Sequence, residues 1–500
     1  MPAPKKIDLP VREEEQALQD GPLAEMVGAT LRDDFARASG LGWLRWTGKV
    51  WEEVTEEVVI EAVRIELRDF MAAEIMAGAS PGRVRLLENL LNSGKIRAVT
   101  GLLRGVLTVD ADSFDVEYDL LNAANGVIDL RTGELLPHDP KYRFTKITQA
   151  SYENGARSRY WAQALRALPE ARRQWIQIRL GQALTGYPPP DDLLPVSKGT
   201  GANGKSTFFD GVRFALGGFA GVVPDRLLTS RDGDHPTELT TLRGLRLAFL
   251  EELPEGGRLN VKRLKDIVGT ESITARKIRE NNITWRATHS LFITTNYTPR
   301  VNETDHGTWR RLALVRFPFT FRKTDTGLRG KFDRLGDATL RERMRYPSVQ
   351  KAALAWLVEG AVAWYAADKT FPALPSAVEK ATLAWRAEAD YIFAFAADHL
   401  VWDASRSILS GDLVTMFNAW LSRNGKPEWG NDLIVERFGS HHLAQDNNVT
   451  KGKLRVKEGQ VSRPPVADGP HIPGPARDIA SVVGKQLAQW VGVAWRAGDD

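Results

Sequence analysis

The 500-residue sequence contains no cysteine, so disulfides, thiolate chemistry and Cys-ligated zinc sites are all excluded. It also lacks any uninterrupted apolar run near the ~20 residues that a helix needs to span a bilayer. The N-terminal stretch MPAPKKIDLPVREEEQ has no apolar core of the kind found in signal peptides. These absences predict a soluble protein of a reducing cytoplasm, with no membrane partner.

An excess of charge of one sign is missing as well. The chain has 67 Lys and Arg residues against 63 Asp and Glu residues, a net charge of only +4. Such a balance does not mark a nucleic-acid-binding protein, so any binding to DNA must come from local basic patches. Hydrophobic residues make up 43% of the sequence, enough for packed cores, and the length predicts about three domains.

Proline- and glycine-rich breaks divide the chain into segments of different pattern. Outside 191–320, apolar residues recur mostly at helical spacing; inside it, strand-like runs alternate with helices, as in a sheet covered by helices. We predict the following division: a flexible arm over 1–22, a mainly helical domain over 23–157, an α/β domain over 158–325, a helical lid or connector over 326–376, and a C-terminal domain over 377–500.

Three tryptophans occur close together in a predicted hairpin. Trp43, Trp46 and Trp51 flank the turn residues Thr47, Gly48 and Lys49. Packing of these rings in a small core is the favoured interpretation. Stacking of the rings on nucleic-acid bases, beside basic side chains, is the alternative.

A phosphate-binding motif is the most specific signal in the sequence, since residues 199–206 match G-x-x-x-x-G-K-[ST]. Glycines at these positions let backbone N–H groups surround phosphate oxygens, while Lys205 reaches the β- and γ-phosphates and the Ser206 hydroxyl binds Mg²⁺. A helix predicted from here onward adds the partial positive charge of its N-terminus. The predicted nucleotide-binding residues are Gly199, Thr200, Gly201, Ala202, Asn203, Gly204, Lys205, Ser206 and Thr207.

Two glutamates follow an apolar strand, 246–250, about 45 residues beyond this loop. Carboxylates at the tip of a strand beside such a loop bind Mg²⁺ through water and polarise the attacking water. We assign Glu252 as the water-orienting base and Glu251 as the acid on the metal side, with the reverse order as the alternative. A further predicted strand, 290–295, ends at Asn296, whose amide is expected to hydrogen-bond the γ-phosphate or the attacking water.

Two adjacent arginines, Arg310 and Arg311, precede another predicted strand. Arginines supplied across a subunit boundary stabilise the transferring phosphoryl group and raise the rate by about 10³–10⁵. An ordinary solvated pair is the alternative interpretation of these two residues.

Five motifs in this order resemble the core of superfamily 3 helicases, in particular the primase-helicases of phages, plasmids and poxviruses. The segment LLNAANGVIDLRTGELLPHDP (120–140) resembles the signature of the helical domain that precedes the ATPase in that family. The five matching segments are GTGANGKST (199–207), RLAFLEE (246–252), LKDIVGTESITARKI (264–278), LFITTNYTPRV (291–301) and GTWRRLALVRFPF (307–319).

The resemblance implies an AAA+-type P-loop ATPase that uses ATP and Mg²⁺, assembles as a hexameric ring and moves along single-stranded DNA. Its motif positions imply that Lys205 and Ser206 contact the nucleotide and that Glu251 and Glu252 are the acidic pair. Asn296 takes the position of the sensor, and Arg310 that of the finger supplied in trans.

The resemblance also implies a pore-lining hairpin near 276–284. Two strand-like runs flank the polar tip 280–282, which agrees with a hairpin. Arg276, Lys277 and Arg279 are then expected to contact DNA phosphates without distinguishing sequence. An ordinary basic hairpin is the alternative.

Two residues depart from the family pattern. Pro195 interrupts the strand predicted before the loop, where a proline is poorly placed, and Lys198 stands in a run that the family fills with apolar residues. We therefore expect a short or distorted strand. Asp110 and Asp112 do not fit a two-metal primase site, because they run directly into the helical-domain signature. A primase is expected to be a separate protein.

The C-terminal region is predicted to form a winged-helix-like domain. Residues 411–423 and 431–443 have the pattern of amphipathic helices, and 450–463 contains five basic residues and one acid. With a basic two-stranded wing, such a module would bind duplex or forked DNA through phosphates, and a solvated charge run is the alternative. His441 and His442 are adjacent and lack acidic or Cys neighbours, which makes a poor metal site.

Together these features predict an ATP-dependent, ring-forming DNA helicase for replication of a phage or mobile element in the cytoplasm of its bacterial host. The expected partners are single-stranded or forked DNA, further copies of the chain in a hexamer, and a separate primase or polymerase. An ATP-switched replication loader or scaffold that does not translocate is the alternative. A DNA-packaging motor, which would need a nuclease partner, is a third hypothesis.

Overall fold

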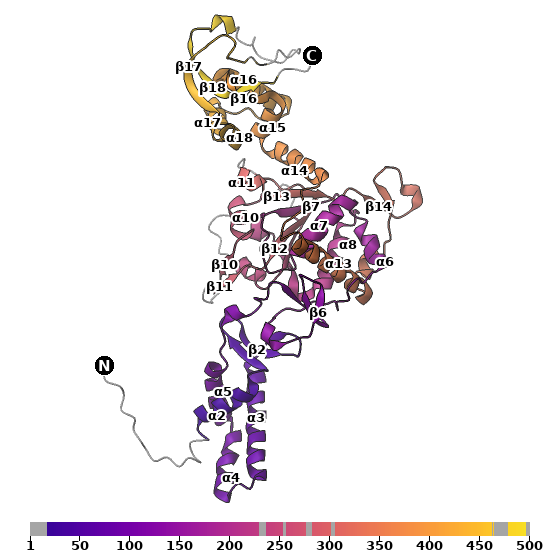
Figure 1. Ribbon diagram of the computed structural model, residues 1–500, viewed down its shortest axis with the longest axis vertical. Coiled ribbons are helices and arrows are strands. Elements are labelled where there is room, and N and C mark those ends of the chain that lie inside the picture. The colour runs from indigo at the N-terminus through magenta and orange to yellow at the C-terminus, as the bar shows by residue number, and fades with distance from the viewer. Residues whose placement is uncertain are drawn as a thin grey trace, which may run out of the picture.

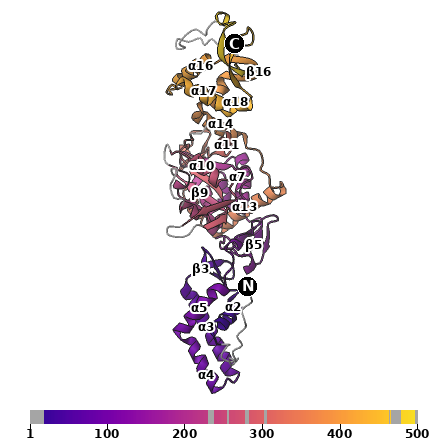
Figure 2. The same ribbon diagram turned by 90° about the vertical axis from the view of Figure 1, so that its left-hand side faces the viewer.

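The computed structural model describes residues 18–229, 237–253, 257–276, 283–301, 306–462, 464 and 479–496. These residues form three parts in a row, which are helical, mixed α/β and again mixed from the N-terminal end to the C-terminal end (Figure 1 and Figure 2). No helix among the described residues is long and apolar enough to cross a membrane.

Helices and a small sheet build the N-terminal part. Val59, Val63 and Leu67 lie on one face of α3 and pack with Val99 and Leu103 of α5, because apolar residues three and four apart share a helix face. The elements are α2 (Asp20–Leu31), β1 (Phe35–Ala38), β2 (Gly42–Trp46), β3 (Trp51–Val54), α3 (Glu56–Met76), α4 (Pro81–Glu88) and α5 (Ser93–Val106).

The predicted tryptophan hairpin is present in this sheet. Strands β2 and β3 pair antiparallel, with Trp46 opposite Trp51. Trp43 and Trp51 are 6% and 5% exposed, so the interpretation that they pack in a core is confirmed for these two rings. A second antiparallel sheet leads to the central part and consists of β4 (Leu120–Ala123), β5 (Gly126–Asp129) and β6 (Glu134–Leu136).

A five-stranded parallel sheet lies at the centre of the molecule, as the alternation of strands and helices predicted. Its strand order is β13-β7-β12-β9-β8. Strand β7, the first of the five in sequence, therefore lies between β12 and β13, which are the last two. All carboxyl ends therefore meet at one edge of the sheet. The strands are β7 (Leu194–Lys198), β8 (Ala220–Val223), β9 (Leu247–Glu251), β12 (Ser290–Thr295) and β13 (Leu312–Arg316).

Both faces of this sheet are buried, as is usual for parallel sheets. Phe249 and Phe292 point to the face covered by α6 (Arg159–Leu165), α7 (Glu170–Gln182), α8 (Lys205–Leu216) and α13 (Pro347–Ala366). Leu250 and Ile293 point to the other face, covered by α9 (Arg226–Thr229), α10 (Val261–Ile267) and α14 (Ser376–Ala389). Helices α13 and α14, which lie beyond the predicted ATPase boundary at 325, thus complete the central core.

Pro195 lies inside β7, and the register explains why a central strand tolerates it. The Leu194 N–H donates to Arg311 O on the β13 side at 2.6 Å, so the next residue faces β12. Pairing with β12 begins only at Val196, opposite Ile293. An N–H at position 195 would have no partner in β12, so the proline costs no hydrogen bond between strands. The expected distortion is limited to a shorter pairing of β7 with β12.

Short elements connect these layers. Asp110 caps one of them by accepting a hydrogen bond from the Asp112 N–H at 3.0 Å, a structural role for the first acid of that pair. The remaining strands and helices are β10 (Ser272–Ala275), β11 (Ile283–Arg286), α11 (His306–Trp309), β14 (Thr320–Arg322), β15 (Asp333–Leu335) and α12 (Leu340–Arg343). The 3-10 turns are η1 (Asn89–Leu91), η2 (Ala111–Ser113), η3 (Pro140–Tyr142), η4 (Gly217–Phe219), η5 (Thr237–Leu242), η6 (Asp325–Gly327) and η7 (Ile479–Ser481).

The C-terminal part alternates helices with an antiparallel sheet of order β16-β18-β17. The elements are α15 (Tyr391–His399), β16 (Leu400–Leu409), α16 (Ser410–Arg423), α17 (Asn431–Ser440), α18 (His442–Asp446), β17 (Thr450–Arg455) and β18 (Gln486–Trp495). Two expectations are corrected here. The predicted helix 431–443 breaks at His441, whose Nε2 pairs with buried Asp390 at 3.0 Å. The basic segment 450–463 supplies one strand, and its partner is β18 rather than a strand of the segment itself.

Candidate functional site

The glycine-rich loop 199–204 lies where it was predicted, between the end of β7 and the start of α8. Gly201 and Gly204 have φ of 97° and 78°, left-handed values that glycine adopts without strain. Ala202 between them has φ of 47°, which a residue with a side chain rarely adopts. Such outliers persist only where the surrounding structure holds them, and they occur often at binding sites.

Side chains and neighbouring strands hold this loop in place. A Cβ on Gly199 would lie 1.8 Å from Asn203 Nδ2, so only glycine fits beneath that side chain. The Asn203 Oδ1 accepts a hydrogen bond from the Lys205 N–H at 3.1 Å. On the other side, the Phe321 N–H of β14 donates to Ala202 O at 2.7 Å. These contacts hold the loop from both sides.

The Lys205 side chain is buried beneath the loop, at 7% exposure. Its Nζ donates to Thr295 O at 2.5 Å and to Asn296 Oδ1 at 3.3 Å, both neutral acceptors. Burial lowers the pKa of this ammonium to about 8, although Glu252 and Glu251 act in the opposite direction. Within the described residues no carboxylate lies at ion-pair distance from Lys205, so an anionic ligand would complete its surroundings.

The predicted polar residues meet at one edge of the sheet because β12 lies between β7 and β9. Asn296 follows β12, and Glu251 is the last residue of β9, opposite Thr294. The Glu252 N–H donates to Thr294 O at 3.0 Å. Glu252 has φ of 57°, an uncommon conformation for a residue with a side chain, and it turns the chain just after the strand. The sheet therefore brings Lys205, Asn296 and both glutamates together.

An arginine contacts Glu251, and the sequence interpretation missed it. Arg213 of α8 donates to Glu251 Oε1 at 3.0 Å and to Asp210 Oδ1 at 2.9 Å, while Arg341 donates to Asp210 Oδ2 at 2.7 Å. The one sequence signal was the spacing of Asp210 and Arg213, three residues apart on a predicted helix. The contact distinguishes the two glutamates, because an arginine already compensates the charge of Glu251.

Oxygen ligands for a hard cation such as Mg²⁺ are available beside the loop. Ser206 and Glu251 are both exposed to solvent. Among the described residues there is no group of three or more His, Asp or Glu side chains that could hold a metal by themselves. The donor set therefore fits an ion that takes most of its six ligands from phosphate and water. Thr200 is exposed at the loop tip, and Thr207 lies on the first turn of α8.

A cavity of about 330 Å³ opens beside the loop. Its volume falls in the range of sites that bind small molecules. Most of its lining comes from segments far apart in the sequence, so no local sequence pattern predicted the cavity. The loop side is formed by Ala202, Gly204 and Thr207, and the other sides by Ala164, Ala167, Phe321, Arg322, Lys323, Gly336, Asp337 and Leu340.

Arg310 and Arg311 lie at the opposite edge of the sheet from the loop. They precede β13, which runs parallel to β7 over five residue pairs, and at roughly 3.3 Å a residue this separates the two edges by about 16 Å. Arg311 donates to Asp192 Oδ2 at 3.0 Å and to Gly307 O at 2.7 Å. Arg310 is more exposed, with 52% of its side chain accessible. Neither side chain reaches the loop of its own chain.

The hairpin predicted between the acidic pair and Asn296 is present. Strands β10 and β11 pair antiparallel, with Ser272 opposite Arg286 and Ala275 opposite Ile283. Arg276 follows β10 and is exposed to solvent. Lys277 and Arg279, together with the tip 280–282, lie outside the described residues.

Comparison with known proteins matches separate parts of the chain. Residues 24–175 match the family described as "D5 N terminal like", and residues 197–311 match a family of unknown function, DUF5906. The chain is 25% identical over 393 residues to a protein of African swine fever virus named primase C962R. It is 24% identical over 291 residues to one of Acanthamoeba polyphaga mimivirus named helicase L207/L206, and 27% identical over 256 residues to one of frog virus 3 named helicase 022R.

These alignments cover 74%, 56% and 47% of this chain but only 39%, 30% and 25% of the relatives. A solved structure of the NrS-1 C terminal region matches with a TM-score of 0.46 at 10% identity, covering 85% of this chain and 86% of that one. The order of motifs, the N-terminal family match and the viral relatives agree. These matches support the resemblance to phage and viral primase-helicases that the motifs predicted.

Proposed function

We propose that this chain is an ATP-dependent DNA helicase of AAA+ type that serves viral or phage replication. One observation carries the proposal: the buried Lys205 ammonium lies beneath the glycine-rich loop with neutral hydrogen-bond partners only, at the sheet edge that also bears Asn296, Glu251 and Glu252. A nucleotide triphosphate supplies the anion that this arrangement lacks. The relatives named as helicases support DNA unwinding as the activity that hydrolysis of this nucleotide drives.

The residues at this edge take separate roles in the proposal. Lys205 binds the β- and γ-phosphates, and Ser206 and Glu251 would hold Mg²⁺, which when bound neutralises phosphate charge. Glu252 orients and deprotonates the attacking water, since no described arginine occupies its carboxylate. Asn296 contacts the γ-phosphate, because its amide oxygen already lies 3.3 Å from Lys205 Nζ. The adjoining cavity, with its apolar walls, takes the base and ribose.

Arg310 completes the site of a neighbouring copy. It lies about 16 Å from the loop of its own chain by strand geometry, and half of its side chain is exposed. A head-to-tail interface repeated around a closed ring places this edge of one copy against the loop of the next. We propose a ring on this basis, with the six copies that the family resemblance implies.

DNA contacts come from two places in the proposal. The β10–β11 hairpin carries Arg276, with Lys277 and Arg279 beyond it in sequence, and binds the phosphates of a single strand. The C-terminal part runs helix, strand, three helices and two strands, from α15 to β18, and this mixture of helices with an antiparallel sheet supports a winged-helix-like module. Lys451, Lys453 and Arg455 line its exposed strand β17 and suit contact with duplex or forked DNA.

Unwinding of a labelled DNA fork tests the function. We expect the wild-type protein to separate the DNA strands only with hydrolysable ATP and Mg²⁺. The Lys205→Ala variant is expected neither to hydrolyse ATP nor to unwind the fork. Wild-type protein that neither hydrolyses ATP nor unwinds any fork would contradict the enzyme. Hydrolysis without unwinding would instead favour the loader or scaffold that does not translocate.

The pKa of Lys205 makes nucleotide binding dependent on pH. The ammonium attracts phosphate and the neutral amine does not, and burial lowers its pKa to about 8. Affinity is therefore full below pH 8 and falls above it, so we expect about tenfold weaker ATP binding at pH 9 than at pH 7. Calorimetric titration with a non-hydrolysable ATP analogue measures this. Lys205→Arg, which stays charged, serves as the control, and its ATP affinity should change little between pH 7 and pH 9. A wild-type affinity that is equally independent of pH would refute the assignment.

A further inference from the structure

We propose that a groove at the base of the β10–β11 hairpin binds single-stranded DNA, with bases on Tyr118 and Tyr187 and phosphates on Arg286 and Lys369. We call it the Tyr118 groove. The inference rests on the proposed function, because it assigns a path to the strand that the helicase would hold. The groove lies apart from the Lys205 site, at the edge of the sheet where the strands begin.

Two cavities form the groove and share one wall. The larger has about 340 Å³ and the smaller about 190 Å³, and Tyr118 and Arg286 line both of them. Ring and proline side chains dominate the larger cavity, which is lined by Tyr118, Tyr187, Pro188, Pro190 and Trp364, with Arg286, Lys369 and Glu271 as its charged members. Two adjoining compartments with aromatic walls suit successive bases of one strand rather than a single small molecule.

Backbone hydrogen bonds at Tyr118 and contacts of its ring with Gly186 and Tyr187 hold the ring in this position. Arg246 is 1% exposed, and its guanidinium donates to Glu117 O at 3.2 Å and Tyr118 O at 3.5 Å. The Gly186 N–H donates to Tyr118 O at 3.0 Å, and a Cβ on Gly186 would lie 2.0 Å from Tyr118 Cδ1. Tyr187 meets the ring edge-on, at 5.4 Å between centroids. A rigid ring loses little entropy when a base stacks on it.

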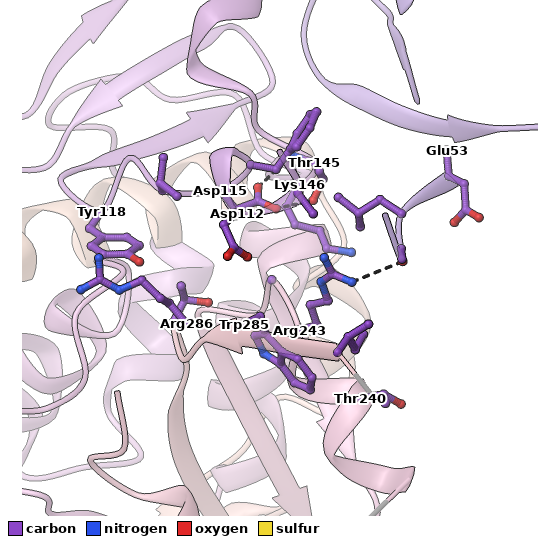
Figure 3. A pocket seen from close by; sticks show the side chains of 18 residues that line it. Glu53, Asp112, Asp115, Tyr118, Thr145, Lys146, Thr240, Arg243, Trp285 and Arg286 are labelled. Carbon is purple, nitrogen blue, oxygen red and sulfur yellow. Dashed lines mark hydrogen bonds between the residues drawn. The ribbon is translucent and has the colours of Figure 1, made fainter. Parts of the chain in front are cut away.

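A cation lies over each of these two rings. Arg286 is exposed, and its guanidinium carbon lies 5.3 Å from the Tyr118 ring centroid; Figure 3 shows the two side chains next to each other. Lys369 Nζ lies 4.3 Å from the Tyr187 centroid. Among the described residues, neither cation has a carboxylate at ion-pair distance, so both remain available to phosphate oxygens.

The acidic residues of the groove concentrate in the smaller cavity. Asp112, Asp115 and Glu53 line it together with Lys146 and Arg243. Asp115 is engaged, since its carboxylate accepts from the Thr145 N–H and hydroxyl at 2.8 and 2.6 Å. Figure 3 places Glu53 away from the Tyr118 ring. The phosphates are therefore assigned to Arg286 and Lys369.

The position of the Tyr118 groove in the fold favours single-stranded DNA as its ligand. Arg286 ends β11, which returns from the hairpin that the proposed function places on DNA, and Glu271 lies just before β10. A strand bound along the hairpin thus passes the mouth of the groove. A duplex is excluded from stacking on Tyr118, because its bases are already paired and stacked.

Fluorescence anisotropy with a labelled oligothymidylate 20-mer tests the groove. We expect Tyr118→Ala to weaken binding about tenfold, because base stacking contributes 1–3 kcal/mol per base, and Tyr118→Phe to bind like the wild type. Arg286→Ala should weaken binding and reduce the slope of log Kd against log salt by about 0.7, the value for one phosphate contact on a single strand. Arg85→Ala, an exposed arginine of α4, is the matched control and should change neither quantity.

The outcomes separate this inference from the proposed function. If the wild type fails to bind the 20-mer, the proposed function fails. If it binds and both Tyr118→Ala and Arg286→Ala bind equally well with an unchanged salt slope, only the groove is refuted. ATP hydrolysis without DNA reports on folding, since neither Tyr118 nor Arg286 is assigned to the nucleotide site of its own chain or of a neighbouring copy. If Tyr118→Ala loses that activity, the DNA affinity and salt slope of Arg286→Ala test the groove instead, because the exposed Arg286 side chain is not part of the core.

Discussion

Replacing Glu252 with glutamine is expected to lower the steady-state rate of ATP hydrolysis about 10³-fold while ATP still binds. A positioned general base contributes 10²–10⁴-fold in rate, and the amide has the same shape but accepts no proton. The position of Glu252 supports this role, since it follows β9 at the sheet edge that bears Lys205 and its charge acts to raise the pKa of that ammonium. Rapid-quench hydrolysis measurements and nucleotide titration would give the rate and the affinity separately.

Glu251→Gln is the matched control for that experiment. Arg213 donates to the Glu251 carboxylate at 3.0 Å, so an arginine already compensates the charge of the glutamate that is assigned to Mg²⁺. We expect Glu251→Gln to raise the Mg²⁺ concentration required for half-maximal activity and to leave the activity at saturating Mg²⁺ closer to that of the wild type. If Glu251→Gln shows the 10³-fold loss and Glu252→Gln does not, the two assignments are reversed.

Replacing Arg310 with alanine is expected to reduce ATP hydrolysis by the assembled protein about 10³-fold, because an arginine that reaches the transferring phosphate contributes 10³–10⁵. The position of Arg310, about 16 Å by strand geometry from the loop of its own chain, predicts that the lost group acts on a neighbour. Mixing Arg310→Ala with Lys205→Ala protein should therefore restore activity. In random mixed rings about one site in four combines an intact loop with an intact arginine.

Arg311→Ala is the control for the trans arrangement. Arg311 is bonded to Asp192 and to Gly307 O and is 16% exposed, so its loss is expected to lower the melting temperature rather than to be complemented by mixing. Absence of any recovery when Arg310→Ala and Lys205→Ala proteins are mixed in an assembly of proven size would show that Arg310 does not act across an interface.

Several elements followed from local sequence because local chemistry determines them. The loop 199–204 needs glycine at its left-handed positions, and α8 begins directly after it. The tryptophan hairpin is set by turn residues between short apolar runs, and β10 and β11 form from the two strand-like runs that the sequence predicted. Lys205 and the two glutamates were assigned from spacing alone, and the sheet brings them to one edge.

Local patterns misplaced features whose cause lies elsewhere in the chain. The predicted helix 431–443 breaks at His441 because Asp390, fifty-one residues earlier, pairs with its ring. The basic segment 450–463 pairs with β18, about thirty residues later, rather than with itself. Pro195 fits a central strand only because pairing with β12 starts one residue further on. None of these partners is adjacent in sequence.

By itself, the sequence determined the chemistry of this protein: which backbone positions take left-handed conformations, which lysine and glutamates accompany them, and which family the order of motifs resembles. Tertiary structure alone decided what surrounds those groups. The Arg213 contact to Glu251, the cavity beside the loop, the placement of Arg310 on the far edge and the Tyr118 groove all join residues distant in the chain. The physical reason is that strand order in a parallel sheet, which sets those neighbours, depends on how the whole core packs rather than on any short segment.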